Sequence, residues 1–124
     1  MTAGNRFSIA NRTKAFAYAI AGLIYVFKTA HAIWIQTVIA ACVVLVGFYL
    51  KISASDWRWI ALAITLVWMT EIMNTAVESV CDALHPEHHP MIGIAKDAAA
   101  GAVLMAGIGA VVIGLLTFWP YVFK

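Results

Sequence analysis

Three long apolar runs, separated by short polar segments, dominate the pattern of hydrophobic and polar positions along the chain. The first run covers residues 32–50, and its only strongly polar member is Gln36. A helix rises ~1.5 Å per residue, so a run of this length can cross a hydrocarbon core ~30 Å thick. The second and third runs are at least as long. We therefore predict membrane-spanning helices over 32–50, 57–84 and 92–119.

The segment before these runs, residues 5–28, has a mixed pattern. Phe16, Ile20, Leu23 and Phe27 recur at helical spacing, which predicts an amphipathic helix lying on the membrane surface. Polar and basic residues gather at its start, namely Arg6, Asn11, Arg12, Thr13 and Lys14. Two interpretations of the basic residues stay open: anchoring to anionic lipid, or contact with a phosphate-bearing ligand.

Two polar segments separate the predicted spans. Residues 51–56 form a short turn, in which Ser55 or Asp56 is available as the N-cap of the next helix. Residues 85–90 contain two prolines, which cannot continue a helix, so we expect a loop there. We expect the second span, 57–84, to project beyond the bilayer in its last two turns, because it is longer than a crossing requires.

Small residues recur along the third predicted span. Ala106, Ala110 and Gly114 follow one another at four-residue spacing, and a cluster of small residues precedes them. This spacing permits close contact between helices, either within the bundle or between subunits of an oligomer.

Composition agrees with an integral membrane protein. Of the 124 residues, 64% are hydrophobic and 11% are charged, whereas soluble domains carry roughly 25% charged residues. The net charge of +2 and the lack of a basic-aromatic array argue against nucleic-acid binding. Cys42 and Cys81 fall within apolar runs, so we expect neither a disulfide nor a thiolate metal centre. The predicted fold class is all-α, with one domain over 1–124, and the first span is expected to act as its own insertion signal.

Positive residues predict the orientation of the chain. Arg6, Arg12, Lys14 and Lys28 precede the first span, whereas Lys51 and Arg58 flank the first turn. Positive charge favours the cytoplasmic side, so the N-terminus and the loop at 85–90 are expected in the cytoplasm, with Lys124 outside. The protein is then expected to be a multi-pass protein of the membrane that bounds the cytoplasm.

Four polar residues share one stripe of the second predicted span. Steps of ~100° per residue place Glu71, Asn74, Glu78 and Asp82 on one helix face. Because charge at membrane depth is unfavourable, this stripe must face protein, water, metal or ligand. Carboxylates are suitable ligands for Mg²⁺ held together with substrate phosphates. Glu71 is the deepest of them, a position suited to a general base acting on a lipid hydroxyl.

Several of the polar residues also have purely structural interpretations. Asn74 is a candidate for a hydrogen bond between helices, and Lys96 and Asp97 for an ion pair at a helix start. His88 and His89 fit solvated loop positions. Two acids on one membrane helix, Glu71 and Glu78, rarely serve packing alone.

The sequence Glu71-Ile72-Met73-Asn74-Thr75-Ala76-Val77-Glu78-Ser79-Val80-Cys81-Asp82, followed by Ala95-Lys96-Asp97, resembles the signature of the small prokaryotic diacylglycerol kinases. That family includes the undecaprenol kinases of Gram-positive bacteria, and residues 89–103 look more like that branch. The resemblance implies a homotrimer with three membrane helices and a surface helix per chain, and active sites between subunits. It also implies MgATP-dependent phosphorylation of a lipid alcohol, either diacylglycerol or undecaprenol.

Carried over residue by residue, the resemblance makes Glu71 the general base, Asn74 its polar partner and Glu78 a Mg²⁺ ligand. The remaining matches are nucleotide-site positions: Asp82, Glu87, His89, Lys96 and Asp97. From the surface helix, Lys14 and Tyr18 are added as candidates for nucleotide binding.

The first half of the chain departs from the family pattern. Where the family has an Asn-Glu pair whose glutamate is a second metal ligand, this chain has Thr29-Ala30. His31 is adjacent, but imidazole is a poorer Mg²⁺ ligand than carboxylate. Positions that are basic in the family are here Ala21, Ile24 and Trp34.

The sequence thus leaves three hypotheses of function. The first is a lipid kinase with Mg²⁺ and ATP. The second is a degenerate, non-catalytic relative that binds lipid or a membrane partner, motivated by Ala30. The third is an ion- or proton-coupled transporter, which accounts for the buried acids but not for the Lys96-Asp97 cluster.

Overall fold

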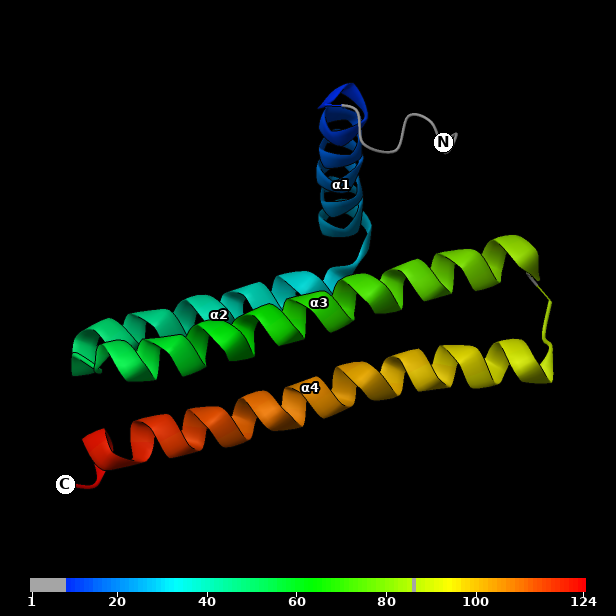
Figure 1. Cartoon of the computed structure of the whole chain (residues 1–124). Helices are drawn as coiled ribbons and strands as arrows, with labels where there is room; N and C mark the ends of the chain where they lie inside the picture. The colour runs from blue at the N-terminus through cyan, green and yellow to red at the C-terminus, as the bar shows by residue number, and fades with distance from the viewer. Residues whose placement is uncertain (1–8, 86) are drawn as a thin grey trace.

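A computed structural model describes residues 9–85 and 87–124, which form four α-helices (Figure 1). In chain order these are α1 (Ile9–Thr29), α2 (His31–Leu50), α3 (Ala54–Leu84) and α4 (Pro90–Val122). The last three are long and apolar enough to cross a membrane, and the described residues contain no strand. The predicted fold class, all-α with three long apolar helices after an N-terminal helix, is therefore confirmed.

The three long helices lie side by side, and α1 leaves them crosswise at the start of α2 (Figure 1). The helix α2 has 20 residues and spans ~30 Å, whereas α3 with 31 residues spans ~46 Å. Both α3 and α4 therefore extend beyond the start of α2 (Figure 1). If α2 matches the hydrocarbon core, α1 lies at the membrane surface and the C-terminal part of α3 projects past it.

Helix α1 keeps its apolar residues exposed. It begins at Ile9, so residues 5–8 of the expected surface helix lie outside the described residues. Phe16, Ile20 and Leu23 are exposed, and Val26 is the buried residue of α1. An exposed apolar stripe on a helix at this level is suited to contact with lipid.

The turn between α2 and α3 is tighter than the sequence predicted. Lys51 adopts the left-handed conformation with φ 55° and ψ 52°, and its N–H donates to the carbonyls of Gly47 and Phe48. Ser53 is the N-cap of α3, since its side chain accepts a hydrogen bond from Asp56 N, so the expected caps Ser55 and Asp56 were wrong. The helix accordingly begins three residues earlier than residue 57.

Gly47 makes this turn possible. A Cβ atom at Gly47 would lie 2.6 Å from the ring of Trp57, so a larger residue there would displace the indole. The Trp57 ring also packs against Phe48, with 4.8 Å between ring centroids. The absence of a side chain at position 47 thus lets the Trp57 ring pack between the end of α2 and the start of α3.

Helix α4 is longer than the expected 92–119. It begins at Pro90, because proline is suited to the first helical turn and the His89 ring accepts a hydrogen bond from Met91 N at 3.1 Å. At its other end it continues through Pro120 to Val122. Tyr121 holds that end, since its hydroxyl donates to Asp56 at 2.5 Å and accepts from Ser53 N at 3.0 Å.

The glycines of α4 do not mark close contacts within the chain. A Cβ atom at Gly101, Gly107 or Gly114 would meet nothing within 4 Å. The expected packing of this span within the bundle is found, because α4 packs along α3, but these glycines are not its closest points. Contact between subunits stays a prediction.

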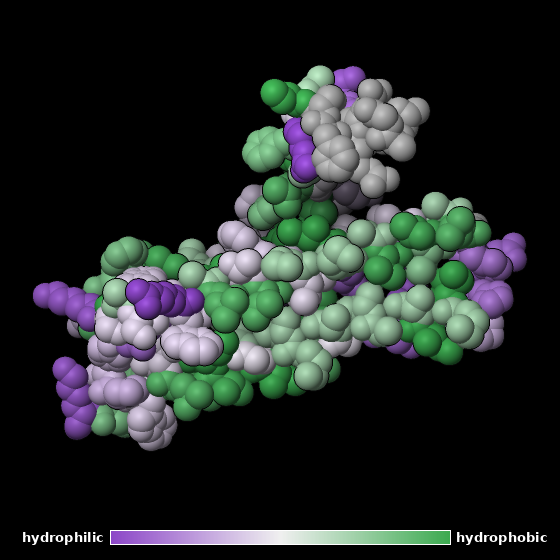
Figure 2. Space-filling view, viewed as in Figure 1, coloured by the Kyte–Doolittle hydropathy of each residue, from purple (hydrophilic) through white to green (hydrophobic). Residues whose placement is uncertain are grey.

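The surface is largely apolar between two polar ends. Figure 2 shows hydrophilic side chains gathered at both ends of the long body, with mostly apolar or neutral ones between them. Many large hydrophobic side chains of α2, α3 and α4 are exposed, such as Leu45, Phe48, Leu104 and Leu116. This distribution is typical of a protein solvated by lipid, and the chain is a membrane protein.

Candidate active site

Glu71 is the most deeply buried acid that the structure describes. It lies on α3, and 5% of its surface is exposed. Gln36 Nε2 of α2 donates a hydrogen bond to Glu71 Oε1 at 3.2 Å. A buried carboxylate needs such a partner, and here the partner comes from the one strongly polar residue of the first span.

Asn74 and Glu78 continue the same face of α3 toward its exposed end. Asn74 Nδ2 lies 3.4 Å from Glu78 Oε1, a long hydrogen bond within one helix rather than between helices. Because a carboxylate only accepts hydrogen bonds, this contact fixes the orientation of the Asn74 amide. Asn74 Oδ1 is then left buried without a hydrogen-bond partner in the structure.

Asp82 pairs with Lys96 across the two long helices. The Lys96 Nζ–Asp82 Oδ1 distance is 2.6 Å, and the side chains are 39% and 65% exposed, respectively. Asp97 is exposed, and the partner of Lys96 is Asp82, so the expected Lys96–Asp97 ion pair was wrong. The reason is geometric: adjacent residues on a helix point ~100° apart, whereas Asp82 faces Lys96 from α3.

Two histidines at the loop between α3 and α4 make contacts within the loop itself. His89 caps α4, and the rings of His85 and His89 are in edge contact with centroids 5.1 Å apart. The Nδ1 atom of His85 lies 2.7 Å from the Glu87 carbonyl oxygen. Glu87 and His88 are exposed. His89 therefore has a structural role in this chain, in addition to its predicted place in a nucleotide site.

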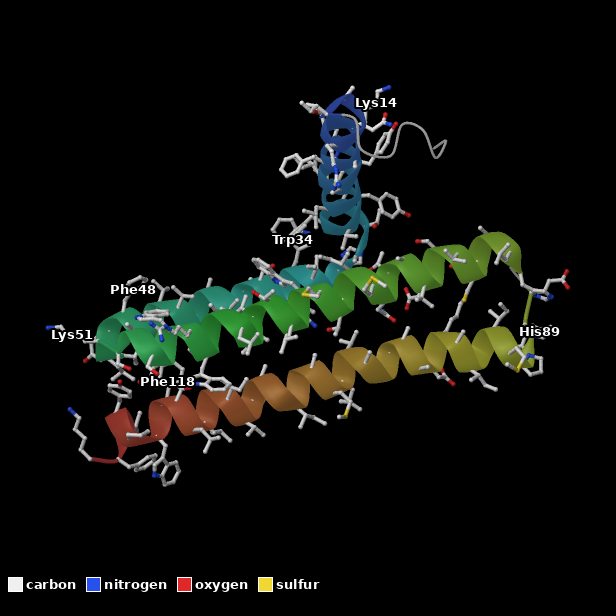
Figure 3. The ribbon with its side chains drawn as sticks, viewed as in Figure 1. Lys14, Trp34, Phe48, Lys51, His89 and Phe118 are labelled. Atoms are coloured by element: carbon white, nitrogen blue, oxygen red, sulfur yellow. The ribbon has the colours of Figure 1, made fainter. Side chains whose placement is uncertain are left out.

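The candidates on α1 lie apart from the others within one chain. Lys14 is at the outer end of α1, while His89 is at the far end of α4 (Figure 3). Tyr18 is also on α1 and is exposed. A single chain thus brings Glu71, Asn74 and Glu78 together on α3 and joins Asp82 to Lys96, but leaves Lys14 and Tyr18 outside that group.

An aromatic cluster fixes the junction of α1 and α2. Trp34 Nε1 donates to the Phe27 carbonyl at 2.5 Å, and Trp34 lies at this junction in Figure 3. The Phe27 ring contacts Trp34 and Trp68 in edge geometry, with centroids 5.5 Å and 6.2 Å away, respectively. Ala30 is the extended N-cap of α2 and makes no side-chain cap bond. An apolar junction therefore stands where the family pattern has basic and acidic residues.

An apolar groove runs along α3 from the level of Gln36 toward the C-terminal end of α4. Its volume is about 630 Å³, and its lining includes Gln36, Ile60, Trp68, Gly107, Gly114 and Phe123. Gln36 joins this groove to Glu71, because the same amide lines the groove and donates to the carboxylate. An apolar groove with one polar amide in its lining is a suitable place for an amphiphile.

Buried polar atoms without a partner gather around Glu71. In the described part of the chain there are three such side-chain atoms: Gln36 Oε1, Trp68 Nε1 and Asn74 Oδ1. Trp68 and Asn74 are each one turn from Glu71 on α3, and Gln36 is bonded to it. Unsatisfied buried polar atoms are rare in native proteins, so this concentration indicates a site that receives a polar ligand.

Gln36 and Trp68 were not among the site candidates. Gln36 had one signal, because it is a lone polar residue in an apolar run. Trp68 had none, since a tryptophan within a membrane span is ordinarily a packing residue.

The arrangement agrees with one known family. Residues 17–118 match the prokaryotic diacylglycerol kinase family, which is most of the chain. The chain belongs to the prokaryotic diacylglycerol kinase family. Its resemblance to this family's signature around Glu71 is therefore confirmed.

Individual relatives cover most of the chain. It is 36% identical over 107 residues to an undecaprenol kinase of Bacillus subtilis, covering 86% of this chain and 87% of the relative. It is 40% identical over 105 residues to a diacylglycerol kinase of Synechocystis, covering 84% and 60%. It is 31% identical over 120 residues to a diacylglycerol kinase of Escherichia coli, covering 91% and 98%. The chain is thus a member of a family of lipid kinases.

Proposed function

We propose that this chain transfers the γ-phosphoryl group of ATP to a lipid alcohol with Mg²⁺ at the cytoplasmic face of a bacterial inner membrane. The observation that supports this most is the environment of Glu71, a buried carboxylate that accepts a hydrogen bond from Gln36, a residue that also lines an apolar groove. A base at that place can meet the hydroxyl of a lipid, whereas ATP stays in water at the exposed end of α3. The relatives named diacylglycerol kinase and undecaprenol kinase support the same reaction type.

In the proposed reaction, Glu71 accepts the proton of the lipid hydroxyl. The hydroxyl oxygen forms a bond to the γ-phosphorus, and the bond from that phosphorus to the β–γ bridging oxygen breaks, so ADP leaves with the electron pair. Glu71 later releases its proton to solvent. Gln36 holds the carboxylate in position throughout, which contributes to the orientation on which phosphoryl transfer depends.

The donor atoms on α3 suit Mg²⁺ bound together with phosphates. Glu78 offers an exposed carboxylate, and Asn74 Oδ1 next to it is a buried oxygen without a partner. The described residues contain no group of three His, Cys, Asp or Glu side chains that could hold a metal ion, which fits a cation that takes most of its ligands from phosphates and water. Bound Mg²⁺ would neutralise charge on the phosphate oxygens.

Asp82, Lys96 and Asp97 are proposed to contact the nucleotide, together with Glu87 and His89 of the loop. Lys96 provides positive charge for phosphate, and it lies beyond the start of α2, where ATP is accessible. Lys14 lies apart from His89 within one chain (Figure 3), and Tyr18 is on the same helix α1, so both are proposed to reach a nucleotide held by another subunit. We therefore propose a homotrimer in which α1 of one subunit covers the site of its neighbour.

A second candidate is a non-catalytic member of the family that binds lipid or a membrane partner. Ala30 favours it, since this position lacks the acidic side chain that the family pattern has there. His31 follows at the first turn of α2, and whether it takes over that role separates the two candidates.

The decisive experiment uses the purified chain in detergent micelles with labelled ATP and a panel containing diacylglycerol, undecaprenol and other lipid alcohols. We expect transfer to at least one of them, and loss of transfer on chelation of Mg²⁺. Ala30→Glu should raise activity if the missing acid limits it, because a carboxylate at a helix N-terminus is compatible with the helix dipole. No transfer to any alcohol, together with no thermal stabilisation by MgATP, would establish the non-catalytic candidate.

A further inference from the structure

We propose that Trp34 is a positioning residue for the nucleotide site, because it fixes the direction in which α1 leaves the bundle. It acts at the junction of α1 and α2, where it closes the end of α1 and joins that helix to α3 through Phe27. The direction of α1 determines where Lys14 and Tyr18 lie. The inference rests on the proposed function, which gives these two residues their role at the nucleotide of a neighbouring subunit.

The end of α1 is closed by a side chain. Helices often end at a residue in the left-handed conformation, but Ala30 after α1 is extended, with φ −96° and ψ 108°. The N–H of Ala30 donates to the Val26 carbonyl at 2.8 Å. In a continuous helix the next carbonyl, that of Phe27, would accept from the N–H of residue 31, and here it accepts from Trp34 Nε1. The indole thus provides a donor to the end of α1 from beyond the bend.

Two edge contacts extend this constraint to α3. The Phe27 ring contacts both Trp34 of α2 and Trp68 of α3, with interplanar angles of 83° and 81°, respectively. Edge-to-face contacts between aromatic rings depend on orientation, so turning α1 about the bend would disrupt both. Trp68 lies three residues before Glu71 on the same helix. The direction of α1 is therefore fixed relative to the helix that carries the proposed base.

Apolar burial on both sides of the bend supports a fixed junction. Val26 of α1 is 5% exposed and Ile33 of α2 is 0% exposed, and α1 contacts both α2 and α3. Farther out on α1, Phe16 and Leu23 are exposed. The helix is thus attached at its C-terminal end, while Lys14 lies near its outer end (Figure 3).

The length of α1 amplifies any change at the bend. Lys14 lies 13 residues before Phe27, which is ~20 Å along a helix. A change of ~20° in the direction of α1 would therefore move Lys14 by roughly 7 Å, more than the reach of a hydrogen bond. A contact between Lys14 and a phosphate thus requires a well-defined bend.

An interfacial anchor is the competing interpretation of Trp34. Tryptophan is enriched at membrane interfaces, and 53% of Trp34 is exposed. The indole N–H of Trp34, however, is bonded to a carbonyl of the chain itself. Trp59 of α3 is 54% exposed and has neither a side-chain hydrogen bond nor a ring contact in the described part of the chain. It is therefore the matched control.

The first test measures the direction of α1 without any reaction. Nitroxide labels on Ala10→Cys of α1 and Val80→Cys of α3, with both native cysteines replaced by alanine, report the distance between the two helices by double electron–electron resonance. Labelled chains are diluted with unlabelled chains, so distances within one chain dominate. Trp34→Ala should broaden the distance distribution at least about twofold, because it removes both the donor and the ring. Trp34→Phe should broaden it less, and Trp59→Ala should leave it unchanged.

The second test asks whether Trp34 acts through Lys14. We measure kcat and KM for ATP in Trp34→Ala, in Lys14→Ala and in the double variant. Each single variant should raise the KM for ATP about tenfold, the effect of losing one charge-assisted hydrogen bond, with kcat changed less than about twofold. The double variant should resemble the single ones, because a Lys14 that is no longer placed at the nucleotide cannot be lost a second time.

The outcomes separate this inference from the proposed function. An unchanged distance distribution in Trp34→Ala would overturn the inference and leave Trp34 as an interfacial anchor. Effects on the KM for ATP that multiply in the double variant would also overturn it, because Trp34 and Lys14 would then act independently. A broadened distribution with an unchanged KM for ATP would exclude the positioning role. A broadened distribution in a chain that phosphorylates no lipid alcohol would support Trp34 as the residue that fixes α1 and contradict the proposed function.

Discussion

Two parts of α3, its N-terminal end and the region around Glu71, differ in whether the chain itself satisfies their buried or capping polar groups. At its N-terminal end, Ser53, Asp56 and Tyr121 satisfy one another through hydrogen bonds of 2.5–3.2 Å. Around Glu71, in contrast, three buried polar atoms of Gln36, Trp68 and Asn74 have no partner in the described part of the chain. Polar groups that serve only the fold are completed by the fold. Groups that serve a ligand are expected to retain hydrogen-bonding capacity, so this difference favours the region around Glu71 as the candidate site.

The largest effect on activity is expected at Glu71. Glu71→Gln should reduce phosphoryl transfer by about a hundredfold or more, because the amide cannot accept the hydroxyl proton. Helix content and thermal stability should change little, since glutamine can keep the contact with Gln36. The measurement is labelled-phosphate transfer beside circular dichroism.

Asp56→Asn is the matched control for Glu71→Gln, because it neutralises an acid on the same helix at the other end. It should leave transfer unchanged. Full activity of Glu71→Gln would show that Glu71 is not the base. Equal losses of activity in Glu71→Gln and Asp56→Asn would mean that the region around Glu71 and the N-terminal end of α3 do not differ in role.

Glu78→Gln is expected to have the next largest effect. It should raise the Mg²⁺ concentration that gives half-maximal transfer by about tenfold or more, because an amide is a weaker ligand for a hard cation than a carboxylate. A Mg²⁺ titration at saturating ATP measures this. An unchanged Mg²⁺ requirement with reduced kcat would place Glu78 away from the metal.

At the N-terminal end of α3, Tyr121→Phe should lower the free energy of unfolding by about 1–2 kcal/mol, because it removes the donor to Asp56 and the acceptor for Ser53 N. Thermal unfolding in detergent checks this. Transfer at a temperature well below unfolding should be retained. A large loss of activity in a stable variant would mean that the N-terminal end of α3 also contributes to catalysis. The two parts of α3 would then not differ in role.

The smallest expected stability effect is that of Asp82→Asn. The Asp82–Lys96 pair is exposed, so solvent screens it and its removal should leave the thermal unfolding temperature almost unchanged. If both residues contact nucleotide, the KM for ATP should still rise several-fold. A loss of stability without any change in the KM for ATP would mean that the pair has only a structural role, as the hydrogen bonds of Tyr121 do.

The sequence predicted the helices better than their contacts. Hydropathy identified the three spans, because each must match a bilayer, and the spacing of Glu71, Asn74 and Glu78 placed them on one face. The cap at Ser53 was missed, since three polar residues within positions 53–56 compete for that role. The partners Gln36–Glu71 and Asp82–Lys96 depend on the depth and rotation of one helix against another, and apolar packing surfaces leave no local signal for either.

The turn between α2 and α3 sets the alignment of residues far from it. The Trp57 ring packs against Gly47, so the end of α2 lies close to the start of α3. Gln36 lies 11 residues before Gly47, and Glu71 lies 14 residues after Trp57, so the Gln36–Glu71 hydrogen bond depends on the length of both helix segments. A residue inserted in α3 between Trp57 and Glu71 would advance the carboxylate by ~1.5 Å and rotate it by ~100°, away from Gln36. The length of each helix between turn and site is therefore under the same constraint as the reactive residues themselves.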